Sequence, residues 1–251
     1  MPDQPPSVPS VTGLAAVPPG PARPWLCCVL PMFVFSLGGM LEPVPSAAGP
    51  AGQLGIPYSA YPVVYSLKMA ATAFAIGWCW PSLRPWLGRP RWWPPLVGLG
   101  LVVPWIVLAS LQRHAGWAEA LGERSGFNPF GGPLGDTASA WSFLAVRAIG
   151  LVILVPLLEE LFLRGFLMRY VIDTRFWEVP FGVPTAAALV ACSVYAVATH
   201  PAEAFAAIGW FGIMSGVAAA TRQPIDCILA HAATNLALGC YVLGTGSWWL
   251  L

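Results

Sequence analysis

Charge is scarce in this 251-residue sequence. Only 9% of the residues are Asp, Glu, Lys or Arg, whereas 57% are hydrophobic. Because an average soluble domain carries roughly 25% charged residues, the chain has too little polar surface to face water on all sides. Its net charge of +1 provides no basic surface for a phosphate backbone, so nucleic acid is not an expected partner.

Cysteine motifs and a recognisable leader are also lacking. The six cysteines lie in apolar stretches without C-x-x-C spacing, which argues against a zinc ribbon or a redox motif and favours small core residues. The Pro-rich start, Met1 to about Arg23, has neither the basic region nor the short apolar region of a cleaved signal peptide. We expect residues 1–23 to be a disordered cytoplasmic lead.

Long apolar runs are what the sequence has instead. Crossing the hydrocarbon core of a bilayer takes about 20 apolar residues, and seven segments approach that length. Several of the 13 Trp residues lie at the ends of these runs, as is typical of membrane interfaces. The sequence therefore predicts an all-α, multi-pass transmembrane bundle of about seven helices, forming a single domain over residues 24–251. The segments are Trp25–Leu41, Tyr61–Trp80, Trp92–Leu111, Ala138–Tyr170, Val183–His200, Ala202–Thr221 and Ile225–Leu243.

The loops between these segments predict an orientation. A polar loop, Gln112–Thr137, separates the third and fourth segments, and its charged residues are mostly acidic. Basic residues instead follow the second, fourth and sixth segments. Since short cytoplasmic loops collect Lys and Arg, we expect the N-terminus inside and the C-terminus outside the cell membrane. The basic residues are Arg84, Arg89, Arg91, Arg164, Arg169, Arg175 and Arg222, and the polar loop holds Glu119, Glu123, Arg124 and Asp136.

Few polar side chains lie at membrane depth, where an ionisable group is costly and is a functional candidate by default. For Lys68 and Arg147 we expect pairing with a carboxylate or extension of the side chain to the membrane surface. The others fall into two groups on three segments. They are Glu159, Glu160, Arg164, His200, His231 and Asn235.

The first group is Glu159-Glu160-Leu161-Phe162-Leu163-Arg164. Residues four apart share a helix face, so Glu160 can pair with Arg164, while Glu159 is rotated by about 100° and has no local partner. A carboxylate neutralised by Arg serves structure. Its unpaired neighbour in an apolar setting suits a general base, which is the role we predict for Glu159.

The second group contains His200, at the end of the fifth segment, and His231-x-x-x-Asn235, on one face of the seventh. Together with Glu159 they could hydrolyse a peptide bond, with a base to activate water and donors for the oxyanion. The set Glu159, His200 and His231 could equally hold one divalent metal such as zinc. Counting about 1.5 Å per residue from the predicted cytoplasmic ends puts Glu159 roughly 16 Å, His231 roughly 10 Å and His200 roughly 25 Å deep. If they converge, the site lies in the cytoplasmic half or the middle of the bilayer.

These motifs, Glu-Glu-x-x-x-Arg, a helix ending in His, and His-x-x-x-Asn, resemble in this order those of the CPBP family of intramembrane proteases. The family includes CAAX prenyl endopeptidases and bacteriocin-processing or immunity proteins. Further stretches look similar to the branch called CAAX prenyl protease-related proteins, found alongside exosortase and PEP-CTERM sorting systems. They include Phe127-Asn128-Pro129-Phe130, Glu159–Tyr170 and Ala230–Gly246.

The resemblance implies a role for each matching residue within a protease core of about residues 138–244. Glu159 and His200 would position and activate the water, His231 and Asn235 would stabilise the oxyanion, and Glu160 with Arg164 would order the site. The family is named for a metalloprotease mechanism, while a glutamate mechanism needs no metal, and the sequence leaves both open. This chain departs from the family's Phe-x-x-x-His motif, because Ala196 stands four positions before His200. Tyr195 could supply the missing ring, or the pocket could differ in width.

From these observations we expect an endopeptidase that cleaves a membrane protein or a lipid-anchored protein within the bilayer, in the setting of an exosortase-type sorting system with its sorting transpeptidase. The alternative is a non-catalytic membrane protein, either a small transporter or a scaffold or immunity partner. A transporter would be expected to show two related halves, which the sequence lacks.

Overall fold

The protein is helical throughout the part that the computed structural model describes, residues 23–45, 49–117, 126–131, 134 and 136–251, with no strand in those ranges. The predicted lead, apart from Arg23, lies outside the described residues, as do Glu119, Glu123 and Arg124 of the polar loop. The first half comprises α1 (Pro24–Met40), α2 (Gly49–Gln53), η1 (Tyr58–Ala60), α3 (Tyr61–Leu83), α4 (Pro94–Gly100) and α5 (Val102–His114).

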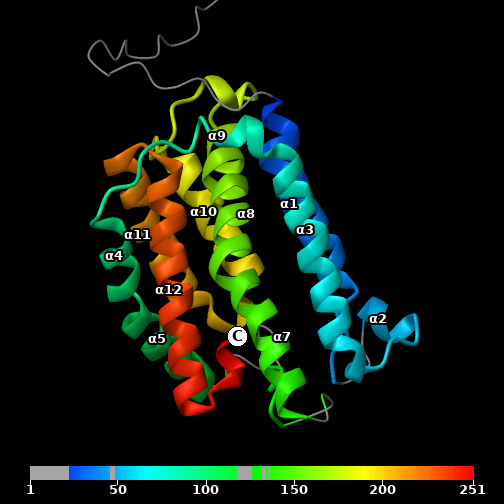
Figure 1. The fold of residues 1–251 in the computed structure, drawn as a ribbon. Helices are drawn as coiled ribbons and strands as arrows, with labels where there is room; N and C mark the ends of the chain where they lie inside the picture. The colour runs from blue at the N-terminus through cyan, green and yellow to red at the C-terminus, as the bar shows by residue number, and fades with distance from the viewer. Residues whose placement is uncertain (1–22, 46–48, 118–125, 132–133, 135) are drawn as a thin grey trace, which may run out of the picture.

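The second half contains one long interrupted helix, the shorter helix α10 and the longer helices α11 and α12 (Figure 1). The interrupted helix runs through α7 (Thr137–Ile149), the π-helical turn η2 (Gly150–Leu154), α8 (Val155–Phe162), a second π-helical turn η3 (Leu163–Leu167) and α9 (Met168–Tyr170). It is followed by η4 (Phe176–Glu178), α10 (Ala186–Thr199), η5 (Pro201–Glu203), α11 (Ala204–Thr221), α12 (Pro224–Thr245) and η6 (Trp248–Leu250).

All seven predicted segments are helical, so the fold class is confirmed. Within the described ranges, five helical segments are long and apolar enough to cross a membrane, and α1 and α10 are shorter apolar helices. Large apolar side chains point outward, among them Phe74 at 71% and Val103 at 66% exposure. An apolar surface of this kind suits lipid rather than water, and the protein is a multi-pass helical bundle.

A short helix brings the fifth segment only part of the way through the bundle. α10 has 14 residues, which corresponds to about 21 Å. At His200 the chain turns through η5 and returns in α11, which packs against α10 (Figure 1). His200 therefore lies in the turn between α10 and α11, about 21 Å from the start of α10 and short of the length needed to cross a bilayer.

One end of the bundle is rich in arginine. Arg91 donates its backbone N–H to Asp226 at 2.8 Å, and Arg222 donates to the carbonyl of Phe181 at 3.2 Å. These bonds join the three connections α3–α4, α9–α10 and α11–α12 at one end, which we call the arginine-rich end. It carries Arg84, Arg89, Arg91, Arg175 and Arg222. Which side of a membrane this end faces stays a prediction.

Two of the buried polar side chains predicted at membrane depth have a partner elsewhere in the chain, and a third, Gln112, lies outside its predicted element. Lys68 forms the expected ion pair with a carboxylate, 2.7 Å from Glu42. Arg147 instead donates to the carbonyl of Phe127 at 2.8 Å. The predicted loop boundary at Gln112 is wrong, because α5 continues to His114 and Gln112 is only 2% exposed.

Candidate active site

The two adjacent glutamates lie in α8, between the two π-helical turns, and both are buried. The ion pair expected from their spacing is present, with Arg164 Nη1 2.5 Å from Glu160 Oε2. Arg164 also donates through Nη2 to the carbonyl of Phe211 at 3.0 Å, which ties α8 to α11. Since π-helical turns often mark functional sites, their position on either side of this pair is informative.

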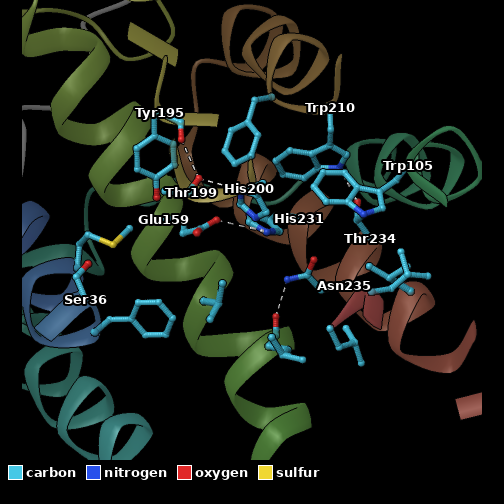
Figure 2. Close-up of a pocket in the computed structure, with 18 residues that line it drawn as sticks. Ser36, Trp105, Glu159, Tyr195, Thr199, His200, Trp210, His231, Thr234 and Asn235 are labelled. Carbon is cyan, nitrogen blue, oxygen red and sulfur yellow. Dashed lines mark hydrogen bonds and ion pairs between the residues drawn. The ribbon is translucent and has the colours of Figure 1, made fainter. Parts of the chain in front are cut away.

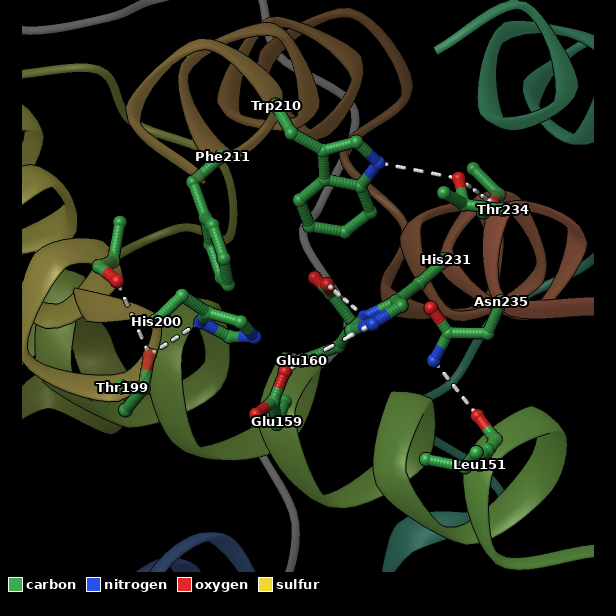
Figure 3. Close-up of polar contacts among 12 residues, drawn as sticks. Leu151, Glu159, Glu160, Thr199, His200, Trp210, Phe211, His231, Thr234 and Asn235 are labelled. Carbon is green, nitrogen blue, oxygen red and sulfur yellow. Dashed lines mark hydrogen bonds and ion pairs between the residues drawn. The ribbon is translucent and has the colours of Figure 1, made fainter. Parts of the chain in front are cut away.

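His231 contacts both glutamates from α12 (Figure 3). Its Nδ1 lies 3.1 Å from Glu160 Oε1, and its Nε2 lies 3.9 Å from Glu159 Oε2. A carboxylate accepting at Nδ1 fixes the proton there and turns Nε2 toward Glu159. Glu160 therefore does more than pair with Arg164, because it also orients His231. The sequence did not indicate this contact.

The His231 ring is further held by packing. It meets the Trp210 ring edge-on with centroids 4.6 Å apart, and Trp210 Nε1 donates to Thr234 Oγ1 at 3.2 Å. Thr234 in turn donates to the carbonyl of Gly98 at 2.9 Å. A Cβ at Gly98 would lie 1.9 Å from the carbonyl oxygen of Ala230, so only glycine allows α4 to approach α12 this closely.

Asn235 lies on α12 one turn after His231 and contacts the interrupted helix. Its Nδ2 donates to the carbonyl of Leu151 at 2.8 Å. That carbonyl is available because Val155 N–H bonds to Gly150 in the π-helical turn, and Pro156 has no N–H to donate. A proline in the sequence thus creates the backbone acceptor that anchors a candidate catalytic amide.

His200 lies in the turn between α10 and α11, in surroundings different from those of His231. Its ring packs edge-on against Trp105 and at a tilt against Phe211. The ring centroids are 5.6 Å apart in both contacts. Its Nδ1 lies 2.8 Å from Thr199 Oγ1. Ala196, four positions before His200, is fully buried and carries no ring. The ring of Phe211 from α11 lies beside His200 instead.

Gln112 holds the turn that carries His200. Its Nε2 donates to the carbonyl of Pro201 at 2.9 Å, and its Oε1 accepts from the N–H of Phe205 at 3.2 Å. Both backbone groups lie where α10 has ended and α11 is beginning, so they have no helical partner. Sequence reasoning missed this residue. The available signal was an amide directly after an apolar run.

Tyr195 places a hydroxyl beside Glu159 (Figure 2). Its side chain is 8% exposed, and its buried oxygen makes no hydrogen bond of good geometry in the described part of the chain. The ring packs toward Phe162 and Phe211 rather than against His200. Tyr195 therefore does not replace the missing phenylalanine and instead presents a polar group to the carboxylate.

All four candidate catalytic residues line one pocket of about 310 Å³ (Figure 2). Glu159, His200, His231 and Asn235 come from α8, the α10–α11 turn and α12, and Glu160 lies behind His231, outside the lining. Within the described residues, no three His, Cys, Asp or Glu side chains gather as a ligand set. Glu159, His200 and His231 therefore do not fit a metal ion in this arrangement.

Comparison with known proteins agrees with the motifs. Residues 141–237 match the family model described as type II CAAX prenyl endopeptidase Rce1-like, which covers less than half of the chain but includes all four candidate catalytic residues. This match confirms the resemblance to the CPBP family and supports CAAX-type intramembrane protease activity at the level of the family. No curated protein and no solved structure matches the chain.

Proposed function

We propose, from the match of residues 141–237 to the Rce1-like CAAX prenyl endopeptidase family, that this protein is an intramembrane endopeptidase acting on a membrane-associated protein. The observation that carries the proposal is the position of Glu159, buried opposite His231 in a pocket, while Glu160 holds the far side of the same imidazole. The catalytic core corresponds to about residues 138–244.

Glu159 is the general base in this proposal. The 3.9 Å between its Oε2 and His231 Nε2 is too long for a direct hydrogen bond and suits a water shared by the two groups. Glu159 takes the proton from this water as its oxygen attacks the peptide carbonyl, and later delivers the proton to the leaving amine. No step requires a metal ion.

Asn235 and His231 stabilise the oxyanion, with His231 donating from a proton on Nε2 in addition to the one on Nδ1 that faces Glu160. His200 helps to position the water. Asn235 uses one amide hydrogen on Leu151 and keeps the second for the substrate. Donors fixed in advance in a buried pocket are effective because they need no reorganisation during the reaction. The hydrogen bond from Asn235 to Leu151, in the interrupted helix that also carries Glu159 and Glu160, supports this assignment.

Tyr195 positions Glu159. Its buried hydroxyl can donate to a carboxylate oxygen, which would leave the other oxygen for the water. Burying a hydroxyl costs free energy that the apolar ring of a phenylalanine would not cost. A hydrogen bond to Glu159 explains why a tyrosine is present at this position.

The substrate we propose is a membrane protein or a lipid-anchored protein, handled in a sorting system that includes an exosortase-type transpeptidase. Support for this finer assignment comes from the sequence stretches that resemble those of CAAX prenyl protease-related proteins, such as Phe127-Asn128-Pro129-Phe130. We place the enzyme in the cell membrane with its arginine-rich end in the cytoplasm.

Cleavage of candidate tail peptides by the purified protein in detergent tests this function. Glu159→Ala and His231→Ala should abolish cleavage without loss of folded protein. If both variants cleave like the wild type, the assignment is wrong. A scaffold or immunity partner would behave differently, since Glu159→Ala would then leave its cellular function intact.

A further inference from the structure

An apolar groove on the outer surface adjoins the catalytic pocket. It lies between α7 and α12, has a volume of about 270 Å³, and shares Leu151, Asn235 and Leu251 with the pocket. Figure 1 shows the end of the chain between the same two helices, in the half of the bundle opposite the arginine-rich end. The groove and the pocket therefore lie on two sides of the same residues, and they meet where Asn235 bonds to the carbonyl of Leu151.

The lining of the groove favours a polypeptide over loose hydrocarbon. Ala145 and Ala148 on α7 face Gly239 on α12, and small residues of this kind let another backbone approach closely within a membrane. Arg147 also lines the groove, and its guanidinium donates to the carbonyl of Phe127 at 2.8 Å. The amide of Asn235, at the junction with the pocket, is then the polar group that a passing chain meets.

We propose that this groove seats an apolar segment of the substrate polypeptide, and that the residues adjoining this segment enter the catalytic pocket past Asn235. The inference rests on the proposed function for its catalytic consequence. It explains how an enzyme with a buried base recognises substrates, since an apolar segment held between α7 and α12 delivers the neighbouring peptide bond to Glu159.

Filling the groove tests the proposal with a matched control. A Cβ at Gly239 meets nothing within 4 Å, and the same holds for Gly77 on the exposed surface of α3, so a larger side chain at either position starts into open space. Equal melting temperatures of the two variants confirm that both are folded. Two peptides with the same cleavable sequence are compared, one with and one without an attached apolar segment of about 20 Leu and Ala residues. Gly239→Phe should raise KM for the long peptide at least about tenfold and leave the short peptide unchanged, whereas Gly77→Phe should change neither.

Equal impairment of both peptides by Gly239→Phe, or of neither, would overturn the groove proposal. A wild-type protein that cleaves no peptide would instead count against the proposed function, and the groove is then tested by binding. Cys240 lines the groove and is exposed, whereas the other five cysteines are buried. The 20-residue Leu and Ala peptide should protect Cys240, but not a cysteine introduced by Gly77→Cys, from a lipid-soluble maleimide. Failure to protect Cys240, or equal protection by a free fatty acid, would overturn the proposal.

Discussion

His231 and His200 line the same pocket but are held in contrasting ways. His231 lies within α12, with a buried carboxylate 3.1 Å from Nδ1 and an indole against its ring. His200 lies in the turn between α10 and α11, held by ring packing, a neighbouring hydroxyl and a neutral amide clamp from Gln112. The arrangement at His231 depends on buried charge, where removal of one partner is severe. The Gln112 clamp beside His200 consists of neutral hydrogen bonds, and the loss of such bonds is smaller.

The largest effect is expected at the buried charges. Glu160→Gln leaves Arg164 buried without its carboxylate and should cost about 3–5 kcal/mol of unfolding free energy, measured by thermal unfolding in detergent. The paired variant Glu160→Met with Arg164→Met removes both charges and should recover most of that stability. It should nevertheless cleave poorly, because His231 has lost its orienting partner. Full activity in the paired variant would contradict the role assigned to Glu160.

A smaller loss is expected where α4 approaches α12, next to His231. Gly98→Ala places a methyl group 1.9 Å from the carbonyl oxygen of Ala230 and should cost about 1–3 kcal/mol by forcing the helices apart. Gly100→Ala is the matched control, because it lies in the same helix and a Cβ there meets nothing within 4 Å. Comparable melting temperatures for the two variants would show that the close approach does not constrain α12.

At the His200 turn, Gln112→Leu tests the neutral clamp. The substitution leaves the carbonyl of Pro201 and the N–H of Phe205 without their partner, at a cost of about 1–3 kcal/mol. Cleavage should fall by roughly tenfold as His200 shifts, a smaller loss than for His231→Ala. Leu111→Ala, on the exposed side of α5, serves as the control and should retain full activity.

The smallest effect is expected at Tyr195. Tyr195→Phe retains the ring contacts with Phe162 and Phe211 and removes only the hydroxyl beside Glu159. We expect kcat to fall about tenfold with KM and thermal stability unchanged, since a hydrogen bond to a charged group is worth about 1.5–3 kcal/mol at most. An unchanged kcat would remove Tyr195 from the mechanism.

The contrast between the two histidines also explains what the sequence could predict. The Glu160–Arg164 pair is local, so helix periodicity alone indicates it. The contact between Glu160 and His231 joins residues on α8 and α12, and no spacing rule connects them. The helices themselves could be predicted from the sequence, because the length of an apolar run decides whether a segment can span a membrane.

The position of His200 could not be read from the sequence for a physical reason. A run of apolar residues predicts a helix but not how far that helix penetrates, and α10 stops after 14 residues because the turn at Pro201 is stabilised from outside by Gln112. Gln112 itself was assigned to a loop, since an amide after an apolar run is typical of a helix end. Only the packed bundle shows that this amide is buried.

Single-turnover cleavage of a tail peptide by Glu159→Gln tests the account most directly. Gln keeps the shape of the side chain but cannot accept the proton, so the rate should fall by about 10²–10⁴-fold while the melting temperature stays that of the wild type. A rate within about tenfold of the wild type would contradict the claim that Glu159 is the base that activates water.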